Sequence, residues 1–206
     1  MSAAPVLARL EALLREQGGL MASLLSEEGV LFAVTQPQAA SAAPPPPTIA
    51  LAESGSERSP NGAGPAQIAA RGPRARAHSE EYELLVEAIF EGYLLHYGTP
   101  RVVRPPEADL GLLAGDQLYA LGLARLVALG DLDAVEELAD VITLTSLAQG
   151  EGREDLALAV WAAGARAVGW GSSDSHRRAK TLVHERDPGA LQAMRAVAEA
   201  GDQSPG

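Results

Sequence analysis

The chain has 206 residues and a formal net charge of −11, and 47% of its residues are hydrophobic but only 4% aromatic. The deficit of Lys and Arg argues against nucleic acid as a partner, because phosphate binding requires a surplus of cations. The absence of cysteine excludes disulfides, thiolate metal sites and a cysteine nucleophile. The charged N-terminus is unlike a signal peptide, and no apolar run approaches the roughly 20 residues of a membrane span. We therefore expect a cytoplasmic protein without a transmembrane segment.

The N-terminal region, residues 1–35, is predicted to contain an amphipathic helix and a short apolar segment. Apolar residues recur at helical spacing between Pro5 and Gln17, and Gly18 and Gly19 end that pattern. A second apolar patch covers 20–32, and its form is left open. We expect the tail at 201–206 to be disordered.

The composition changes sharply over residues 36–78. The proline run Ala43–Pro47 is followed by small polar residues that bury too little area to order a chain. The sequence predicts a disordered linker here. Docking of the prolines into an aromatic groove of another protein is the alternative.

The region 79–200 is predicted to be a helical domain. Its first helix covers 79–97, with Ser79 as the N-cap and an apolar face that includes Leu85 and Ile89. Glu83, Glu87 and Glu91 recur on the opposite face, which we expect to be exposed.

The second predicted helix, 108–129, is apolar nearly all round, which is typical of a helix at the centre of a bundle. Asp133 and Glu136 have capping-box spacing and predict the start of a third helix. A fourth is expected over 154–169, and Asp187 with Pro188 predicts the N-terminus of a short last helix. Because no segment alternates like a strand, the predicted fold class is all-α.

Candidate chemistry is sparse. The four histidines are His78, His96, His176 and His184, and none belongs to a cluster with metal-ligand spacing, so we expect them to be solvated. No phosphate-binding loop or nucleophile elbow is present. The sequence predicts no catalytic residue, no metal site and no cofactor.

Asp116 differs from the acidic residues near helix starts, which the helix dipole and capping explain: Glu80, Glu81, Glu83, Asp131 and Asp133. It lies among Leu112, Leu113 and Leu118, where a charge is costly unless it is paired. It either caps a helix that begins near Gly115 or has a function.

The order of short motifs resembles that of trans-isoprenyl (polyprenyl) diphosphate synthases. Members of that family carry a helix that opens Gly-Asp-x-Leu, a glycine turn, and a helix with Leu-Ala-Asp that ends near Ala-Glu-Gly-Glu. The matching positions here are Leu94, Leu95, His96, Gly115, Asp116, Leu118, Gly130, Leu138, Ala139, Asp140, Ala148, Gly150 and Glu151. The resemblance covers 82 to about 169, less than half of a family member, and implies a partial isoprenoid-synthase-like bundle. It implies a structural, tunnel or interface role for Gly115, Asp116, Leu118, Tyr119, Gly150 and Glu151.

The departures from the family pattern concern the metal ligands. Where the family has Asp-Asp-x-x-Asp after the histidine, this chain has Tyr97 to Arg101, and no paired aspartates follow Glu154. The family uses those aspartates to hold Mg²⁺ on the allylic diphosphate, and Mg²⁺ requires such oxygen ligands. Arg101 and Arg104 either face a diphosphate or are solvated.

The chain is in this respect similar to the small, non-catalytic component I of heteromeric heptaprenyl diphosphate synthases. The resemblance implies a catalytic polyprenyl diphosphate synthase subunit as partner and a role in isoprenoid (quinone side-chain) biosynthesis. It also implies that the apolar helix over 108–129 contributes a dimer contact or a tunnel wall, and the alternative is that this helix is simply core. The alternatives are a helical protein-interaction module without an isoprenoid role, whose 6–14 stripe binds a partner, and an active enzyme of another type.

Overall fold

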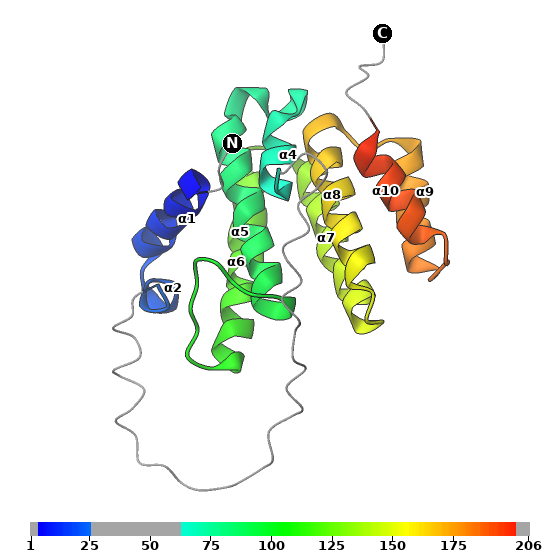
Figure 1. The fold of residues 1–206 in the computed structure, drawn as a ribbon. Coiled ribbons are helices and arrows are strands. Elements are labelled where there is room, and N and C mark those ends of the chain that lie inside the picture. Colours follow the sequence, from blue (N-terminus) through cyan, green and yellow to red (C-terminus); the bar gives the residue numbers. More distant parts are fainter. Residues whose placement is uncertain (1–3, 26–62, 201–206) are drawn as a thin grey trace, which may run out of the picture.

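The computed structural model describes residues 4–25 and 63–200, and every regular element in these ranges is helical, which confirms the all-α prediction. The elements lie roughly side by side, from α1 and α2 at one end to α9 and α10 at the other (Figure 1). In chain order they are α1 Ala4–Gln17, α2 Gly19–Ser23, α4 Pro65–Arg71, the 3-10 helix η1 Pro73–His78, α5 Ser79–Tyr97, α6 Ala108–Ala128, α7 Leu132–Gly150, α8 Glu154–Trp170, α9 Asp174–His184 and α10 Ala190–Glu199.

The helix α8 lies at the centre of the main core. Trp161 is almost fully buried there and meets the ring of Phe90 edge-on at 5.0 Å. The alanines and glycines of α8 let α4, α7 and α10 pack closely around it. The small residues predicted for this helix therefore place it, and not α6, in the middle of the bundle.

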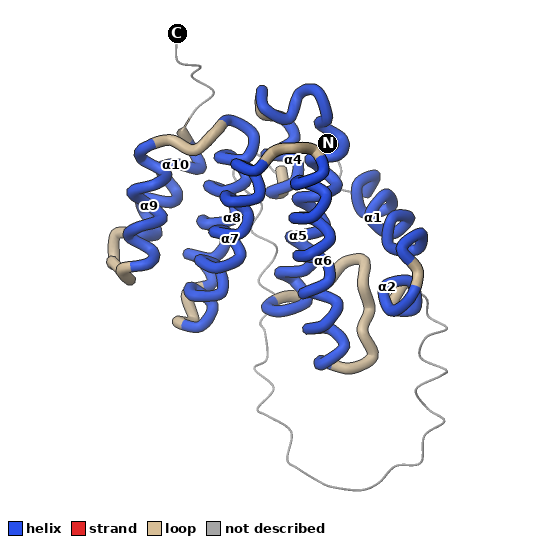
Figure 2. The backbone as a smooth tube through the Cα atoms, turned by 180° about the vertical axis from the view of Figure 1, so that it is seen from behind, coloured by secondary structure: helices blue, strands red, loops and turns tan. Residues whose placement is uncertain are grey.

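The helix α6 packs mainly on α5 and exposes its other side, so the prediction that it is central is wrong. Leu113 and Val127 are 58% and 52% exposed. Of the described helices, α6 is the one long and apolar enough to cross a membrane, with a third of its most apolar window buried. Its packing on α5 is also that of a helix in a soluble bundle, and Figure 2 shows the pair from behind.

The helical domain begins earlier than predicted. The sequence predicts a linker that includes 63–78, but α4 starts at Pro65 and buries Ala66 and Ala69 completely. Gly72 and Gly169 bring two backbones so close that a Cβ at either would overlap the other chain segment. The composition of this stretch suggested disorder because small residues bury little area each, yet here they permit close contact with α8. The described residues do not include 36–62 of the predicted linker, 26–35 of the predicted N-terminal segment, or the predicted tail at 201–206.

The N-terminal helix α1 packs against the bundle. Leu10 and Leu14 are fully buried in a cluster that includes Leu118 of α6. Arg9 pairs with Glu83 of α5 at 3.1 Å. The apolar stripe of α1 therefore has an intramolecular partner, which argues against the prediction that it binds another protein.

The helix starts differ from the predicted caps. Ser79 lies inside α5 and makes no capping bond, and Asp131, not Asp133, caps α7 by accepting from the Ala134 N–H at 3.1 Å. Asp187 accepts from the Gly189 N–H in a turn before α10, whose N-cap is Gly189. The helix α9, capped by Ser173, was not predicted.

Candidate functional site

Four of the six residues that the sequence singled out, Gly115, Asp116, Leu118 and Tyr119, lie on α6 where it crosses α5. The His96 ring stacks on Tyr119 at 5.3 Å, and its Nε2 lies 3.2 Å from Asp116 Oδ1. A Cβ at Gly115 would lie 2.7 Å from the His96 ring, so only glycine leaves room for it. Burial raises the pKa of the Tyr119 hydroxyl, and the nearby Tyr97, Tyr93 and Asp116 act in the same direction.

These contacts answer the question about Asp116. It lies in the middle of α6, so it is not an N-cap, and its side chain is 71% exposed. The carboxylate therefore bears no desolvation cost and needs no ligand to be stable there. Leu118 belongs to the buried cluster with α1 and does not face this contact.

The other two, Gly150 and Glu151, lie elsewhere. Gly150 is the last residue of α7, and Glu151 follows it as the C-cap. Glu151 pairs with Arg186, between α9 and α10, at 2.8 Å. The six positions therefore do not form one site.

The loop that stands in place of the family's aspartates is fixed by a buried carboxylate. Glu91 is fully buried, and its Oε1 accepts from the N–H groups of residues 101, 102 and 103 at 2.7, 2.6 and 3.2 Å. Arg101 pairs with both Glu87 and Glu91. Burial raises the pKa of Glu87, and the Arg101 charge opposes this shift. The prediction that Glu87 and Glu91 are exposed is wrong, because the loop folds back over this side of α5.

Arg101 is thus neither solvated nor directed at a ligand. Its guanidinium lies 5.1 Å from the centre of the Phe90 ring in addition to its two carboxylates. The backbone N–H of Arg104 donates to the Leu24 carbonyl at 3.0 Å, which joins this loop to α2. Contacts within the chain therefore account for the conformation of the loop 98–107, and no bound diphosphate is needed to explain it.

A network of polar and charged side chains around the buried Glu137 joins α7 to α9, and sequence reasoning missed it. Glu137 Oε1 lies 2.5 Å from His176 Nε2, and Glu137 Oε2 accepts from Lys180 at 3.0 Å. Lys180 also donates to Asp140 at 2.6 Å. His176 is 2% exposed, so the expectation that it is solvated is wrong. The signal in the sequence was the spacing of His176, Ala179 and Val183, one face of a helix that Ser173 caps.

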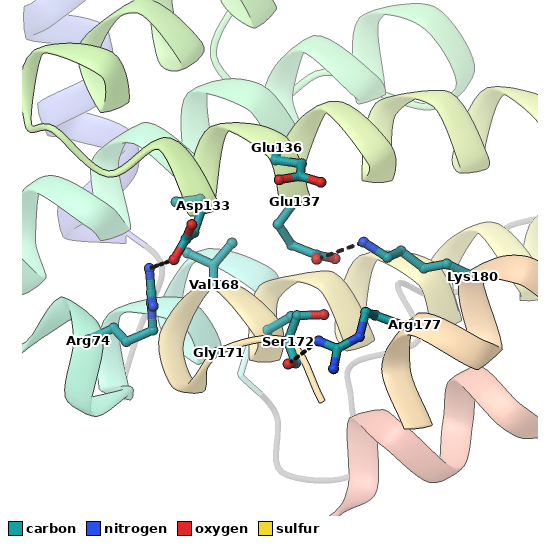
Figure 3. A pocket seen from close by; sticks show the side chains of 11 residues that line it. Arg74, Asp133, Glu136, Glu137, Val168, Gly171, Ser172, Arg177 and Lys180 are labelled. Atoms are coloured by element: carbon teal, nitrogen blue, oxygen red, sulfur yellow. Dashed lines mark hydrogen bonds and ion pairs between the residues drawn. The ribbon is translucent and has the colours of Figure 1, made fainter. Parts of the chain in front are cut away.

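This network borders a pocket of about 400 Å³ between α7, α8 and α9 (Figure 3). Every cation that lines it already has a carboxylate. Arg74 pairs with Asp131 and Asp133, Arg177 with Asp174, and Lys180 with Glu137 and Asp140.

The pocket therefore offers no free charge to an anionic substrate. No group of three or more possible metal ligands occurs within 4–25 and 63–200. The pairs stabilise helix contacts and do not form a recognisable catalytic constellation.

Comparisons with protein-family models, with curated proteins and with solved structures gave no match for this chain. Its function must accordingly be argued from its own residues.

Proposed function

We propose that this chain is a non-catalytic helical subunit that binds a partner protein through the outer face of α6. The observation that carries the proposal is an uncharged stripe of exposed residues along that helix, which we call the α6 seam. It consists of Leu113, Gln117, Ala120, Ala124 and Val127. These positions alternate in steps of four and three residues, which is the spacing of the contact seam in a coiled coil.

The composition of the α6 seam suits a helix as partner. Leu113 and Val127 supply apolar area near its ends, and Ala120 and Ala124 let another backbone approach in its middle. Burial of apolar surface contributes roughly 25 cal/mol per Å², so the two large side chains alone favour docking. Monomeric soluble proteins rarely expose large apolar patches, and Leu113 and Val127 are both more than half exposed on this one helix face.

We further propose that the partner is a catalytic polyprenyl diphosphate synthase subunit and that the complex is cytoplasmic. This finer proposal rests on the motif order that His96, Gly115 and Asp116 share with that family, and on the missing metal ligands after His96. The chain would then shape or stabilise the catalytic subunit that makes a quinone side chain.

A helical interaction module without an isoprenoid role is the second candidate. The α6 seam favours it equally, because an apolar heptad face requires only a complementary helix and carries no chemical signature of an isoprenoid.

Co-expression with the Asp-rich synthase of the same cell tests both parts. We expect this chain to co-purify with the synthase. We expect the length of the synthase's product to change when this chain is withheld. The double variant Leu113→Gln/Val127→Gln should weaken the complex at least tenfold. Leu20→Gln, which changes an exposed leucine of α2, is the matched control and should leave binding unchanged.

The outcomes separate the two parts of the proposal. Absence of a complex with the synthase contradicts the isoprenoid role, and capture of another helical protein that depends on the α6 seam then supports the module. A complex that both seam substitutions leave intact contradicts the docking surface. Binding of the seam to lipid vesicles in place of protein would overturn the proposal as a whole.

A further inference from the structure

The exposed side of α6 carries charge of one sign. Three residues of this helix are charged, Asp109, Asp116 and Arg125. Arg125 is neutralised by Glu81 of α5, since its Nη1 lies 3.2 Å from that carboxylate. Asp109 is exposed, and the side chain of Asp116 is 71% exposed although His96 lies 3.2 Å away. The charge that α6 presents outward is therefore negative.

The two aspartates lie along one edge of the α6 seam. They are seven residues apart, so they occupy the same side of the helix, two turns from each other. Asp109 precedes Leu113 of the seam by four residues, and Asp116 precedes Ala120 by four, so each is a neighbour of a seam residue. In a coiled coil, residues beside the seam face the corresponding residues of the partner helix, and their charges determine which partner is accepted.

This charge pattern disfavours a second copy of the chain as the occupant of the seam. If two α6 helices packed antiparallel, the aspartates of one copy would face those of the other, and like charges across an interface oppose binding. Each copy also carries a net charge of −11, so two copies repel each other in any orientation. The same repulsion acts against nucleic acid and against an anionic membrane. A helix with positive charges beside its apolar residues meets none of these objections.

We infer that the partner helix carries Lys or Arg beside its own apolar seam, and that these cations lie against Asp109 and Asp116. The inference rests on the proposed function, because it specifies the partner of the α6 seam. The apolar side chains supply the buried area, and the charges supply the selection. Exposed ion pairs add little stability each, but charges at the rim of an interface speed the encounter with the right partner and reject the wrong one.

Two synthetic helical peptides of four heptads test the inference with the full chain. Both have leucine at the seam positions, and the residues that flank the seam are all lysine in the basic peptide and all glutamate in the acidic peptide. Fluorescence anisotropy measures their binding. We expect the basic peptide to bind saturably, one per chain, and at least about tenfold more tightly than the acidic peptide. In about 1 M salt, which screens charges beyond roughly 3 Å, this preference should largely disappear.

Reversal of the two charges locates the effect. Asp109→Lys/Asp116→Lys should lower the affinity for the basic peptide at least about tenfold. Glu136→Lys/Glu199→Lys is the matched control, because both glutamates are exposed, lie on α7 and α10 outside the seam, and give the same change in net charge. It should bind the basic peptide within about twofold of the unaltered chain. Circular dichroism establishes that each variant keeps its helices, and Asp116→Lys alone provides the test if the double variant does not fold.

The outcomes distinguish this inference from the proposed function. An equal loss of affinity in the two lysine double variants would overturn the inference, because attraction by overall charge would explain both. If Leu113→Gln/Val127→Gln weakens the complex with the synthase but Asp109→Lys/Asp116→Lys does not, the seam is the docking surface and only the basic partner helix is refuted. Self-association in light scattering that Leu113→Gln/Val127→Gln abolishes would also overturn the inference, because a second copy would then cover the seam. A lack of saturable binding of the basic peptide would do the same.

Discussion

Two helix contacts in this protein are built on opposite principles. Where α5 crosses α6, Gly92 and Gly115 bring the backbones together, and a Cβ at Gly92 would lie 2.9 Å from the Gly115 carbonyl oxygen. Where α9 meets α7, the buried carboxylate of Glu137 contacts the buried His176 and the half-buried Lys180. The first contact depends on shape and the second on paired charges.

The difference determines how each contact responds to change. A closely packed contact without charges is stabilised by many small dispersion interactions, and this stabilisation decreases gradually as atoms are displaced. A buried charge network gains little when it is intact, but removal of one partner leaves the others desolvated and unpaired. We therefore expect the α7–α9 contact to be the more sensitive of the two to a single substitution.

The largest effect is expected for Glu137→Ala. It leaves His176 and Lys180 without their shared carboxylate, and the free energy of unfolding should fall by about 3–5 kcal/mol. Urea unfolding followed by circular dichroism measures it. The neighbouring Glu136→Ala, at an exposed position of the same helix, should change stability by under about 0.5 kcal/mol. Equal effects of the two substitutions would refute a role for the network in stability.

Gly92→Val tests the other contact. The added side chain meets the Gly115 carbonyl and the Tyr119 ring, and the unfolding free energy should fall by about 1–3 kcal/mol. Gly150→Ala is the control, because a Cβ there meets nothing within 4 Å. It should be neutral or slightly stabilising, since alanine is favoured over glycine in a helix. A larger fall in the free energy of unfolding for Gly92→Val than for Glu137→Ala would contradict the expectation that the α7–α9 contact is the more sensitive one.

A third contact, between α5 and the start of α7, adds a pH dependence. The Tyr82 hydroxyl donates to Asp131 at 2.5 Å, and Arg74 pairs with the same carboxylate at 2.8 Å. Burial and the bond to Asp131 raise the pKa of Tyr82 to about 12. Although burial opposes it, the bonds from Tyr82, the Ala134 N–H and Arg74 lower the pKa of Asp131.

Tyr82→Phe should therefore cost about 1 kcal/mol near pH 7, with a characteristic dependence on pH. A raised tyrosine pKa stabilises the fold below about pH 10, and this stabilisation is lost as the pH rises toward 12. A lowered aspartate pKa stabilises it above about pH 3.9, and this is lost as the pH falls further. The difference between the two proteins in urea unfolding should shrink at both extremes. Tyr97→Phe, at an exposed ring, should show no such difference at any pH, and a constant Tyr82→Phe effect would exclude the hydrogen bond as its source.

Helix positions were largely predictable from the sequence because they depend on local pattern. The predicted 79–97 coincides with α5, and 108–129 and 154–169 differ by one residue from α6 and α8. Apolar spacing and glycine breaks lie within each segment, so no distant residue is needed to recognise them.

The burial of charged residues was not predictable in the same way. Glu87 and Glu91 have the spacing of a solvated face, and only the fold-back of residues 101–103 buries them. His176 is buried because Glu137, 39 positions away, supplies its partner. The helix α9 was missed for a related reason, since its buried face is short and contains a histidine.

The exposure of α6 also required the tertiary structure. A helix that is apolar all round is central only if the same chain surrounds it, and the described residues cover α6 mainly on the side of α5. An apolar pattern therefore does not by itself distinguish a core helix from a helix that exposes one apolar side.

The smallest effect is expected for Asp116→Asn, and it separates scaffold from function at the α5–α6 contact. Asp116 is 71% exposed and 3.2 Å from His96, so loss of its charge should change the unfolding free energy by under about 0.5 kcal/mol. His96→Ala removes the stack on Tyr119 as well and should cost about 0.5–1.5 kcal/mol more. If Asp116→Asn leaves stability unaltered but weakens the complex with the synthase tenfold, the exposed carboxylate acts in partner binding. If both measurements stay unchanged, the glycine and the ring stack alone account for this contact, and the motif is scaffold.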